Sequence, residues 1–275
     1  MSLFYSYKNT TVRIGPKPMI DYYDYLYKSN TYLKIYLTFN NIIILSSIDY
    51  IPNLAPGANN TSDTTGWLFR CYYGATLSNT TFKWGSNSLY LNLNFARNTI
   101  STYTFPQNTG LTFTIWVNIT SNNNAVGPLF SFTNSSNTVS LRLNSKTAGV
   151  ASNNGPWYLN YKIESASYYV DPTITKNPIN QNTWNHFAWT ISPAAYGALT
   201  TYIFYINGTQ VASINSSSLG TIYPQNYARN TNDFGAEPGI SPLVGYFDTF
   251  RFYETALTAS DINAIYNYAD PKNIM

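Results

Sequence analysis

Apolar and polar side chains alternate along much of this chain, and the clearest run lies between residues 184 and 214. Every second residue is large and apolar over 187–191 and again over 202–206. A period of two sends alternate side chains to opposite faces of a sheet. Asn207 and Gly208 separate the second run from a third, and both residues tolerate the positive φ of a type I′ hairpin turn. The pattern predicts three consecutive antiparallel strands.

The same alternation predicts further strands on both sides of this stretch. They cover residues 31–39, 67–73, 89–95, 113–119, 129–132, 139–143, 157–163 and 244–253. Turn-forming residues dominate 51–66 and 224–242, which are predicted as loops. After the last strand, Thr258 is a favourable helix N-cap with Asp261 at N3. Many short strands and one C-terminal helix predict an all-β fold, an antiparallel two-sheet jelly-roll sandwich.

The N-terminal part differs from the rest in composition. Residues 1–29 are rich in tyrosine and contain Gly15, Pro16 and Pro18, which interrupt regular structure. We expect an irregular extension that either packs on the domain or docks as an arm on a neighbouring subunit. Residues 30–275 are predicted to form one jelly-roll domain.

Composition narrows the classes of function. Aromatic residues make up 17% of the 275 residues, enough for a large core, and charged residues only 10%. The net charge is +3 without a Lys/Arg run, which argues against a nucleic-acid partner. The single cysteine, Cys71, excludes an intramolecular disulfide and a multi-cysteine zinc site.

Targeting signals are also missing from the printed sequence. The first 19 residues lack the apolar core of a signal peptide, and the longest aliphatic run, 42–45, is too short to span a bilayer. We therefore expect synthesis in a cytoplasm, without a membrane span. Location on a virion or other particle surface is compatible with that expectation.

Five stretches follow one another in an order known from a protein family. They are GSNSLYLN, LTFTIWVNI, NTWNHFAWTIS, TYIFYINGTQVAS and VGYFDTFRFYETALTASDINAIYNY. Together they resemble the laminin G-like branch of the concanavalin A-like lectin/glucanase superfamily, over residues 30–268. The resemblance implies a jelly roll of two curved sheets. Members are mostly binding or adhesion modules, with glycosidases in some branches.

The acidic residues argue against glycoside hydrolysis. Glucanases of this superfamily carry an acidic cluster on one strand, of the form Glu-x-Asp-x-x-Glu, and the 12 acidic residues here form no such cluster. Glu164 is the one glutamate on a predicted strand with a position suited to a cleft, and it lacks the second carboxylate that the reaction normally needs. His186, the single histidine, lies inside a predicted strand, where we expect a hydrogen-bonded structural role.

Candidate sugar-binding residues lie in the stretch ASNNGPWYLN. Trp157 and Tyr158 would offer rings for stacking, and Asn153 and Asn154 would offer amides for hydrogen bonds to hydroxyls. The alternative is that Trp157 belongs to the core. Composition does not choose between these roles, because aromatic and amide side chains occur throughout the chain.

Three carboxylates are candidate ligands for calcium, the one cofactor that we consider. Asp233 and Glu237 share a late predicted loop, and Asp248 falls on the face shared by Phe250 and Phe252. Calcium takes six to eight oxygen ligands, usually from several carboxylates. The alternatives are solvated loop carboxylates for the pair, and for Asp248 a hydrogen-bonded side chain that ties a loop or the helix in place.

These features predict a non-catalytic structural or surface-interaction protein with a lectin-like jelly roll. Low charge, the lack of disulfides and the Asn- and Tyr-rich composition suit a subunit of an assembled particle, such as a capsid or fibre component of a large DNA virus. Its partners would then be other protein subunits. The alternative is a free carbohydrate-binding module, a lectin or adhesion domain, with glycans as partners.

Overall fold

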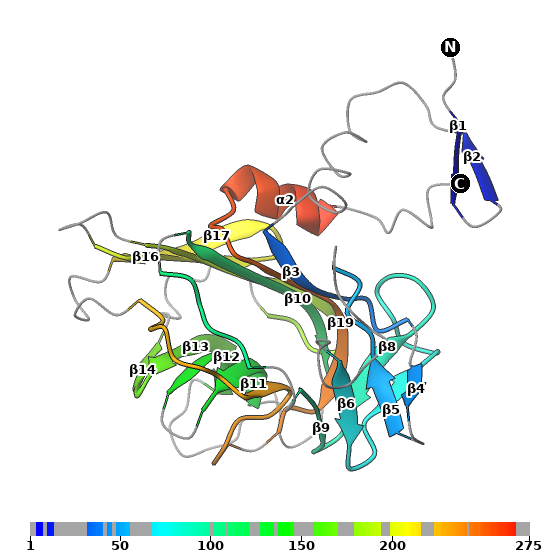
Figure 1. Ribbon diagram of the computed structural model, residues 1–275, viewed down its shortest axis with the longest axis horizontal. Coiled ribbons are helices and arrows are strands. Elements are labelled where there is room, and N and C mark those ends of the chain that lie inside the picture. The colour runs from blue at the N-terminus through cyan, green and yellow to red at the C-terminus, as the bar shows by residue number, and fades with distance from the viewer. Residues whose placement is uncertain are drawn as a thin grey trace.

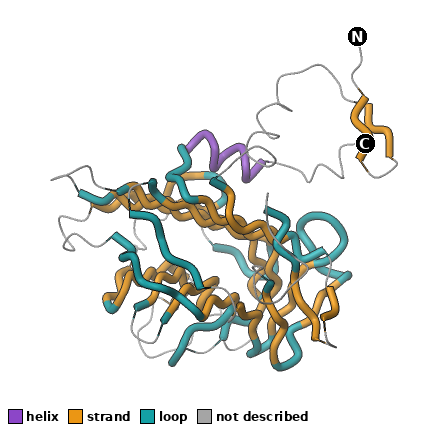
Figure 2. Tube along the Cα trace, in the orientation of Figure 1, coloured by secondary structure: helices purple, strands orange, loops and turns teal. Residues whose placement is uncertain are grey.

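The chain folds into two large antiparallel sheets stacked on one another, with a helix on the outer side of one sheet (Figure 1). The computed structural model describes residues 4–7, 10–13, 32–40, 43–45, 48–55, 68–98, 102–107, 109–120, 127–134, 137–145, 157–169, 179–193, 199–215, 223–240 and 242–267. Figure 2 shows that strands dominate this part of the chain. The predicted all-β sandwich with one short helix is therefore confirmed for the described residues.

The eight-stranded sheet has the strand order β17-β16-β15-β10-β19-β8-β7, and β3 also pairs with β19. Its strands are β3 (Leu33–Leu37), β7 (Thr76–Ser78), β8 (Ser88–Leu91), β10 (Leu111–Ile119), β15 (Trp184–Ser192), β16 (Thr201–Ile206), β17 (Thr209–Asn215) and β19 (Gly245–Tyr253). The predicted unit of three antiparallel strands is β15-β16-β17. Asn207 and Gly208 have φ values of 51° and 74°, as the predicted turn requires.

The nine-stranded sheet has the order β14-β13-β12-β11-β18-β9-β6-β5-β4. Its strands are β4 (Ile43–Leu45), β5 (Ile48–Ile51), β6 (Phe69–Tyr72), β9 (Phe95–Asn98), β11 (Gly127–Thr133), β12 (Thr138–Ser145), β13 (Trp157–Glu164), β14 (Ala166–Tyr169) and β18 (Thr231–Phe234). The predicted hairpin is β11-β12. Strand β18 was not expected, because it lies inside the predicted loop 224–242, where turn formers surround four strand residues.

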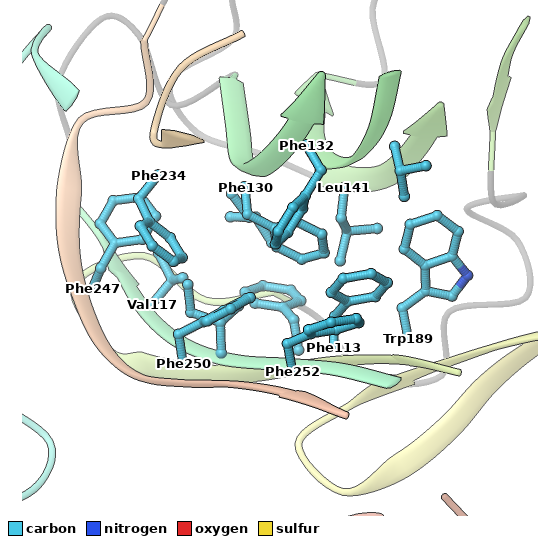
Figure 3. Packing of buried hydrophobic residues seen from close by; sticks show 14 of the residues in the cluster. Phe113, Val117, Phe130, Phe132, Leu141, Trp189, Phe234, Phe247, Phe250 and Phe252 are labelled. Carbon is cyan, nitrogen blue, oxygen red and sulfur yellow. The ribbon is translucent and has the colours of Figure 1, made fainter. Parts of the chain in front are cut away.

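Aromatic side chains from the inner faces of both sheets form the core (Figure 3). The ring of Phe113 on β10 stacks on Phe130 of β11 and on Phe252 of β19, with both centroid distances 4.8 Å. All three side chains are buried. Burying one such side chain stabilises the fold by about 1.5–3 kcal/mol. Because this core takes alternate residues wherever a strand is regular, it also decides which side chains face outward.

The predicted strand over 89–95 is wrong, because the structure divides it between the two sheets. Leu89 and Leu91 lie on β8 and are fully buried, whereas Leu93 is 52% exposed. Leu93 has a φ of 60°, and the backbone N–H of Asn92 donates to Oδ1 of Asn94 at 2.8 Å. This turn carries the chain from one sheet to the other. Alternation alone does not reveal such a crossing, since the period of two continues through it in the sequence.

Helix α2 (Ala259–Asn267) packs on the outer face of the eight-stranded sheet (Figure 1). Its start confirms the predicted cap. The backbone N–H of Asp261 donates to the Thr258 hydroxyl at 3.2 Å, and that of Thr258 donates to Asp261 Oδ2 at 2.8 Å. Ile262 and Ile265 are buried against the sheet.

Part of the N-terminal extension is regular. Strands β1 (Phe4–Tyr7) and β2 (Thr10–Arg13) form a separate two-stranded antiparallel sheet, which the prediction of an irregular segment over 1–29 did not include. Residues 14–31 lie outside the described residues, so the docking arm and the boundary at residue 30 stay predictions. Within the described residues, no helix has the length and apolar character to cross a membrane.

Candidate functional site

Two chain crossings meet at one corner of the sandwich. Strand β6 continues through Tyr73 and Gly74 into β7, and β8 continues through the turn at Leu93 into β9. Since β6 pairs with β9 in one sheet and β7 pairs with β8 in the other, the two crossings lie side by side. Tyr73 has a φ of 54°, which is uncommon for a bulky side chain. Backbone held in such a conformation tends to occur at functional sites.

Three aromatic rings gather at this corner, and we call Tyr72, Tyr73 and Phe95 the corner aromatics. Tyr72 lies directly opposite Phe95 in the sheet, and their rings stack at 5.3 Å. The Tyr73 ring lies 5.5 Å from Phe95 and 6.1 Å from Tyr72. Tyr73 is 83% exposed. The corner thus presents a supported aromatic ring to solvent.

The period of two explains why the rings of Tyr72 and Phe95 face outward. On β6, Phe69 belongs to the core and Cys71 packs against it, so Arg70 and Tyr72 take the outer face. On β9, Ala96 belongs to the core, which leaves its two neighbours on the outer face of the nine-stranded sheet.

Two arginines accompany the corner aromatics. The guanidinium of Arg70 lies 4.7 Å from the Tyr72 ring centroid, and that of Arg97 lies 4.4 Å from the Phe95 centroid. Arg97 also donates two hydrogen bonds to Asp233, Nε to Oδ1 at 2.6 Å and Nη2 to Oδ2 at 2.7 Å. These bonds raise the pKa of Arg97. Burial raises the pKa of the Asp233 carboxyl, and Arg97 opposes that shift.

Asp233 and Glu237, two of the predicted calcium ligands, both bind cationic side chains. Glu237 is buried and accepts hydrogen bonds from Nε of Arg142, at 2.6 Å, and from its Nη2; Nζ of Lys162 lies 3.5 Å away. Across the described ranges, no group of three or more His, Cys, Asp and Glu side chains could hold a metal ion. Calcium binding by these carboxylates stays a prediction, and the donors observed around Asp233 and Glu237 are arginine and lysine side chains.

Asp248 lies on the opposite face from the predicted one. Its register partner is Trp116 on the outer face of the eight-stranded sheet, whereas Phe250 and Phe252 belong to the core. The register between β10 and β19 shifts at this point, and Thr249 has a φ of 46°. Such a bulge moves the following residues to the other face.

The Asp248 carboxylate ties a loop to the sheet, the structural alternative named for it. Oδ2 accepts the backbone N–H groups of Lys83, at 2.8 Å, and Trp84, at 2.9 Å, and Oδ1 accepts the Thr249 hydroxyl at 2.8 Å. Burial raises the pKa of Asp248 to about 7.

The predicted sugar-binding stretch is only partly described. Trp157 and Tyr158 begin β13, opposite Ser145 and Asn144 on β12, but the placement of their side chains lies outside the description. Asn153 and Asn154 lie outside the described residues. A role in sugar binding stays a prediction for all four.

The two residues considered for catalysis, Glu164 and His186, have structural roles: Glu164 is ion-paired and His186 is buried. Glu164 forms an ion pair with the fully buried Arg229 and accepts the backbone N–H of Gln225 at 2.8 Å. His186 is fully buried, with its ring centroid 5.1 Å from that of Trp116. Its ring nitrogens have no hydrogen-bond partner within the described residues, so the expected hydrogen bonding of this histidine is not observed. Burial, together with Arg251 and Lys83, lowers the pKa of His186 to about 3.

Sequence reasoning did not single out the corner aromatics. A signal was present in the predicted strand 67–73, where alternation places Arg70 and Tyr72 on one face beside the following Gly74. The partner strand of β6 is not predicted, because the stretch 89–95 reads as one continuous strand in the sequence and is divided between β8 and β9 in the structure. Only the register of β6 with β9 brings Phe95 and Arg97 to this surface.

Comparison with known proteins supports the architecture. The model of a family described as "Concanavalin A-like lectin/glucanases superfamily" matches residues 74–263. No curated protein sequence matches the chain.

Three solved structures illustrate the likeness. Domain 4 of AbnA, an extracellular GH43 arabinanase from Geobacillus stearothermophilus solved with arabinotriose, is 19% identical with a TM-score of 0.51, covering 86% of this chain and 98% of that domain. The binding domain of Paraclostridial Mosquitocidal Protein 1 is 15% identical with a TM-score of 0.54, covering 86% of this chain and 52% of that one. The binding domain of botulinum neurotoxin serotype D is 13% identical with a TM-score of 0.55, covering 86% and 51%. At these identities the likeness shows the fold alone.

Proposed function

The chain belongs to the concanavalin A-like lectin/glucanase superfamily, and we propose that it is a non-catalytic carbohydrate-binding module that holds sugars at the corner aromatics. Among structures of this fold, the arabinanase domain was solved with arabinotriose, and the two toxin structures are binding domains. These examples support a binding role for the fold. The corner itself supports the location.

The exposed ring of Tyr73 is the observation that carries the proposal. Because Tyr73 is 83% exposed, burial contributes little to the position of its ring. The rings of Tyr72 and Phe95, at centroid distances of 6.1 Å and 5.5 Å, hold it in place instead. A ring held in place before binding loses little conformational freedom when a ligand arrives. Binding sites combine such apolar faces with a few well-placed polar groups, which the neighbouring arginines supply.

The state of the carboxylates supports a role without catalysis. Hydrolysis of a glycosidic bond normally needs one carboxylic acid and one free carboxylate on opposite sides of the bond. Glu164, Asp233 and Glu237 each form an ion pair with an arginine. A carboxylate held in this way is poorly placed to act as an acid or a nucleophile.

A glycan array followed by calorimetry with the purified chain tests the proposal. We expect Tyr73→Ala to weaken binding of the preferred sugar about tenfold, because the stacking face is lost. Tyr227→Ala is the matched control: Tyr227 is 45% exposed and precedes β18 at the end away from Phe95, so affinity should not change. Absence of binding to every sugar, or equal affinity of both variants, would overturn the proposal.

A second candidate function is that of a subunit of an assembled particle. The β1-β2 sheet pairs with no other described strand, and a two-stranded sheet is marginally stable alone. Docking of residues 1–29 on a neighbouring subunit would stabilise it. Light scattering of the full chain and of a chain starting at residue 30 tests this candidate. It requires an oligomer that is lost on truncation, and a monomer in both cases would rule it out.

A further inference from the structure

The charges at the corner do not balance. Arg70 on β6 and Arg97 on β9 lie directly opposite one another, and like charges in that position destabilise a sheet. Asp233, opposite Arg97 on its other side, neutralises one of them. On the other side of Arg70, the residue opposite is Tyr50 of β5. Two opposed cations are therefore accompanied by one carboxylate.

Arg70 is the unneutralised partner. Both oxygens of Asp233 accept hydrogen bonds from Arg97, so that carboxylate is already engaged. The contact that the structure gives Arg70 is with the Tyr72 ring, and within the described residues no carboxylate pairs with it. Its side chain is partly exposed. A guanidinium donates hydrogen bonds in a planar fork that fits both oxygens of a carboxylate.

Arg70 and the exposed ring share one neighbour. The Tyr72 ring lies 4.7 Å from the Arg70 guanidinium and 6.1 Å from the Tyr73 ring. A ligand that brings a carboxylate to Arg70 can therefore lay an apolar face on Tyr73. A sugar acid has both features, since its C–H groups form an apolar face and its carboxylate projects from the ring.

We propose that the corner binds a carboxylate-bearing sugar, with Arg70 on the carboxylate and Tyr73 against the face of the sugar ring. This inference rests on the proposed function and adds the chemical class of the ligand. The anion would also relieve the repulsion between Arg70 and Arg97. Neutral sugars would bind the same rings without that contribution.

Pairs of sugars that differ only at the acid group test the proposal. Trisaccharides of galacturonic acid and of galactose are one pair, and those of glucuronic acid and glucose are another. For the full chain, we expect the acidic member of at least one pair to bind about tenfold more tightly, as a charge-assisted hydrogen bond contributes. That preference should shrink as salt is raised, because exposed charges are screened.

Variants at Arg70 separate the contribution of its charge to binding from the contribution of its planar shape. Arg70→Gln should reduce the ratio of acidic to neutral affinity to about one while neutral binding remains, and Arg70→Lys should give an intermediate ratio, because an ammonium lacks the planar fork. Lys34→Gln is the control for net charge, since Lys34 lies on β3 in the other sheet and should leave the ratio unchanged. Unfolding temperature checks that each variant is folded.

The outcomes separate the two proposals. Equal affinity for acidic and neutral sugars in the natural chain overturns the acidic-sugar inference without any variant, as does an acidic preference that survives Arg70→Gln. In both cases sugar binding that depends on Tyr73 would remain. Absence of binding to both members of every pair would overturn this inference alone if another sugar of the array binds through Tyr73. Absence of binding to every sugar of the array would overturn it together with the proposed function.

Discussion

Two places on this molecule combine aromatic rings, a cation and a carboxylate, and they differ in what covers them. Beside helix α2, Nζ of Lys83 lies 4.3 Å from the Trp116 ring centroid, and Asp248 lies opposite Trp116 in the sheet. The ring of Tyr266, on the helix, stacks on Trp116 at 5.4 Å. At the corner, similar groups meet around Tyr73, and the one helix of the described residues, α2, lies away from β6 and β9 (Figure 1). In the first place Trp116, His186 and Asp248 are buried, whereas in the second the Tyr73 ring is exposed.

Burial decides what each set of groups can do. In the covered place, burial lowers the pKa of Lys83, raises that of Asp248 to about 7 and lowers that of His186 to about 3. These groups hold a loop and a helix against the sheet. At the corner, the outermost ring stays in solvent. Similar sets of aromatic, cationic and carboxylate side chains thus stabilise the fold where they are buried and can bind a ligand where they are exposed.

The largest expected effect concerns His186, in the covered place. The pKa of His186 is about 3 in the folded chain and near 6.5 in the unfolded chain. Its contribution to the free energy of unfolding is therefore fully present above about pH 6.5 and is lost as the pH falls toward 3. Between pH 7 and pH 4, the natural chain should lose on the order of 3 kcal/mol of unfolding free energy through this group. Urea unfolding of the natural chain and of His186→Asn at several pH values measures the difference.

Subtracting the two curves removes the contribution of the other titrating groups, provided that they respond equally. Tyr227→Ala, which leaves the covered place intact, should keep the acid loss of the natural chain. If the curves of the natural chain and His186→Asn run parallel from pH 7 to pH 4, then His186 is not held neutral by burial.

The smallest expected effect concerns backbone strain at the corner. Tyr73 has a φ of 54°, where glycine is favoured over a side chain. Tyr73→Gly should therefore keep or raise the unfolding free energy, by up to about 1 kcal/mol, while it abolishes the stacking face. Leu93→Gly, at a φ of 60° on the neighbouring crossing, is the matched control and should keep sugar affinity. A clear loss of stability in Tyr73→Gly would show that the ring supports the fold.

Strands and turns that depend on neighbours in sequence were predictable. Alternation and the Asn207-Gly208 pair indicated β15 to β17, and the Thr258 cap indicated the start of α2. Both are short-range effects, because a period of two or a capping side chain acts over a few residues. The order of the five family stretches then indicated the superfamily, which the family match confirms.

Features that depend on the partner strand were not predictable. The crossing at Leu93 preserves the period of two, so it is invisible in the sequence pattern. The bulge beside Asp248 reverses the face of the residues around it, and only pairing with β10 reveals the shift. The corner depends on the crossing at Leu93 and on the register of β6 with β9, which places Arg70 opposite Arg97.

Mapping the bound sugar on the protein is the decisive test of the corner as a sugar-binding site. The amide resonances of the full chain would be followed by NMR during titration with the tightest-binding sugar from the array. If the corner is the site, the largest changes fall on residues 70–74 and 95–97, and residues 153–158 stay unchanged. Largest changes over residues 153–158, or anywhere away from the corner, would contradict the account.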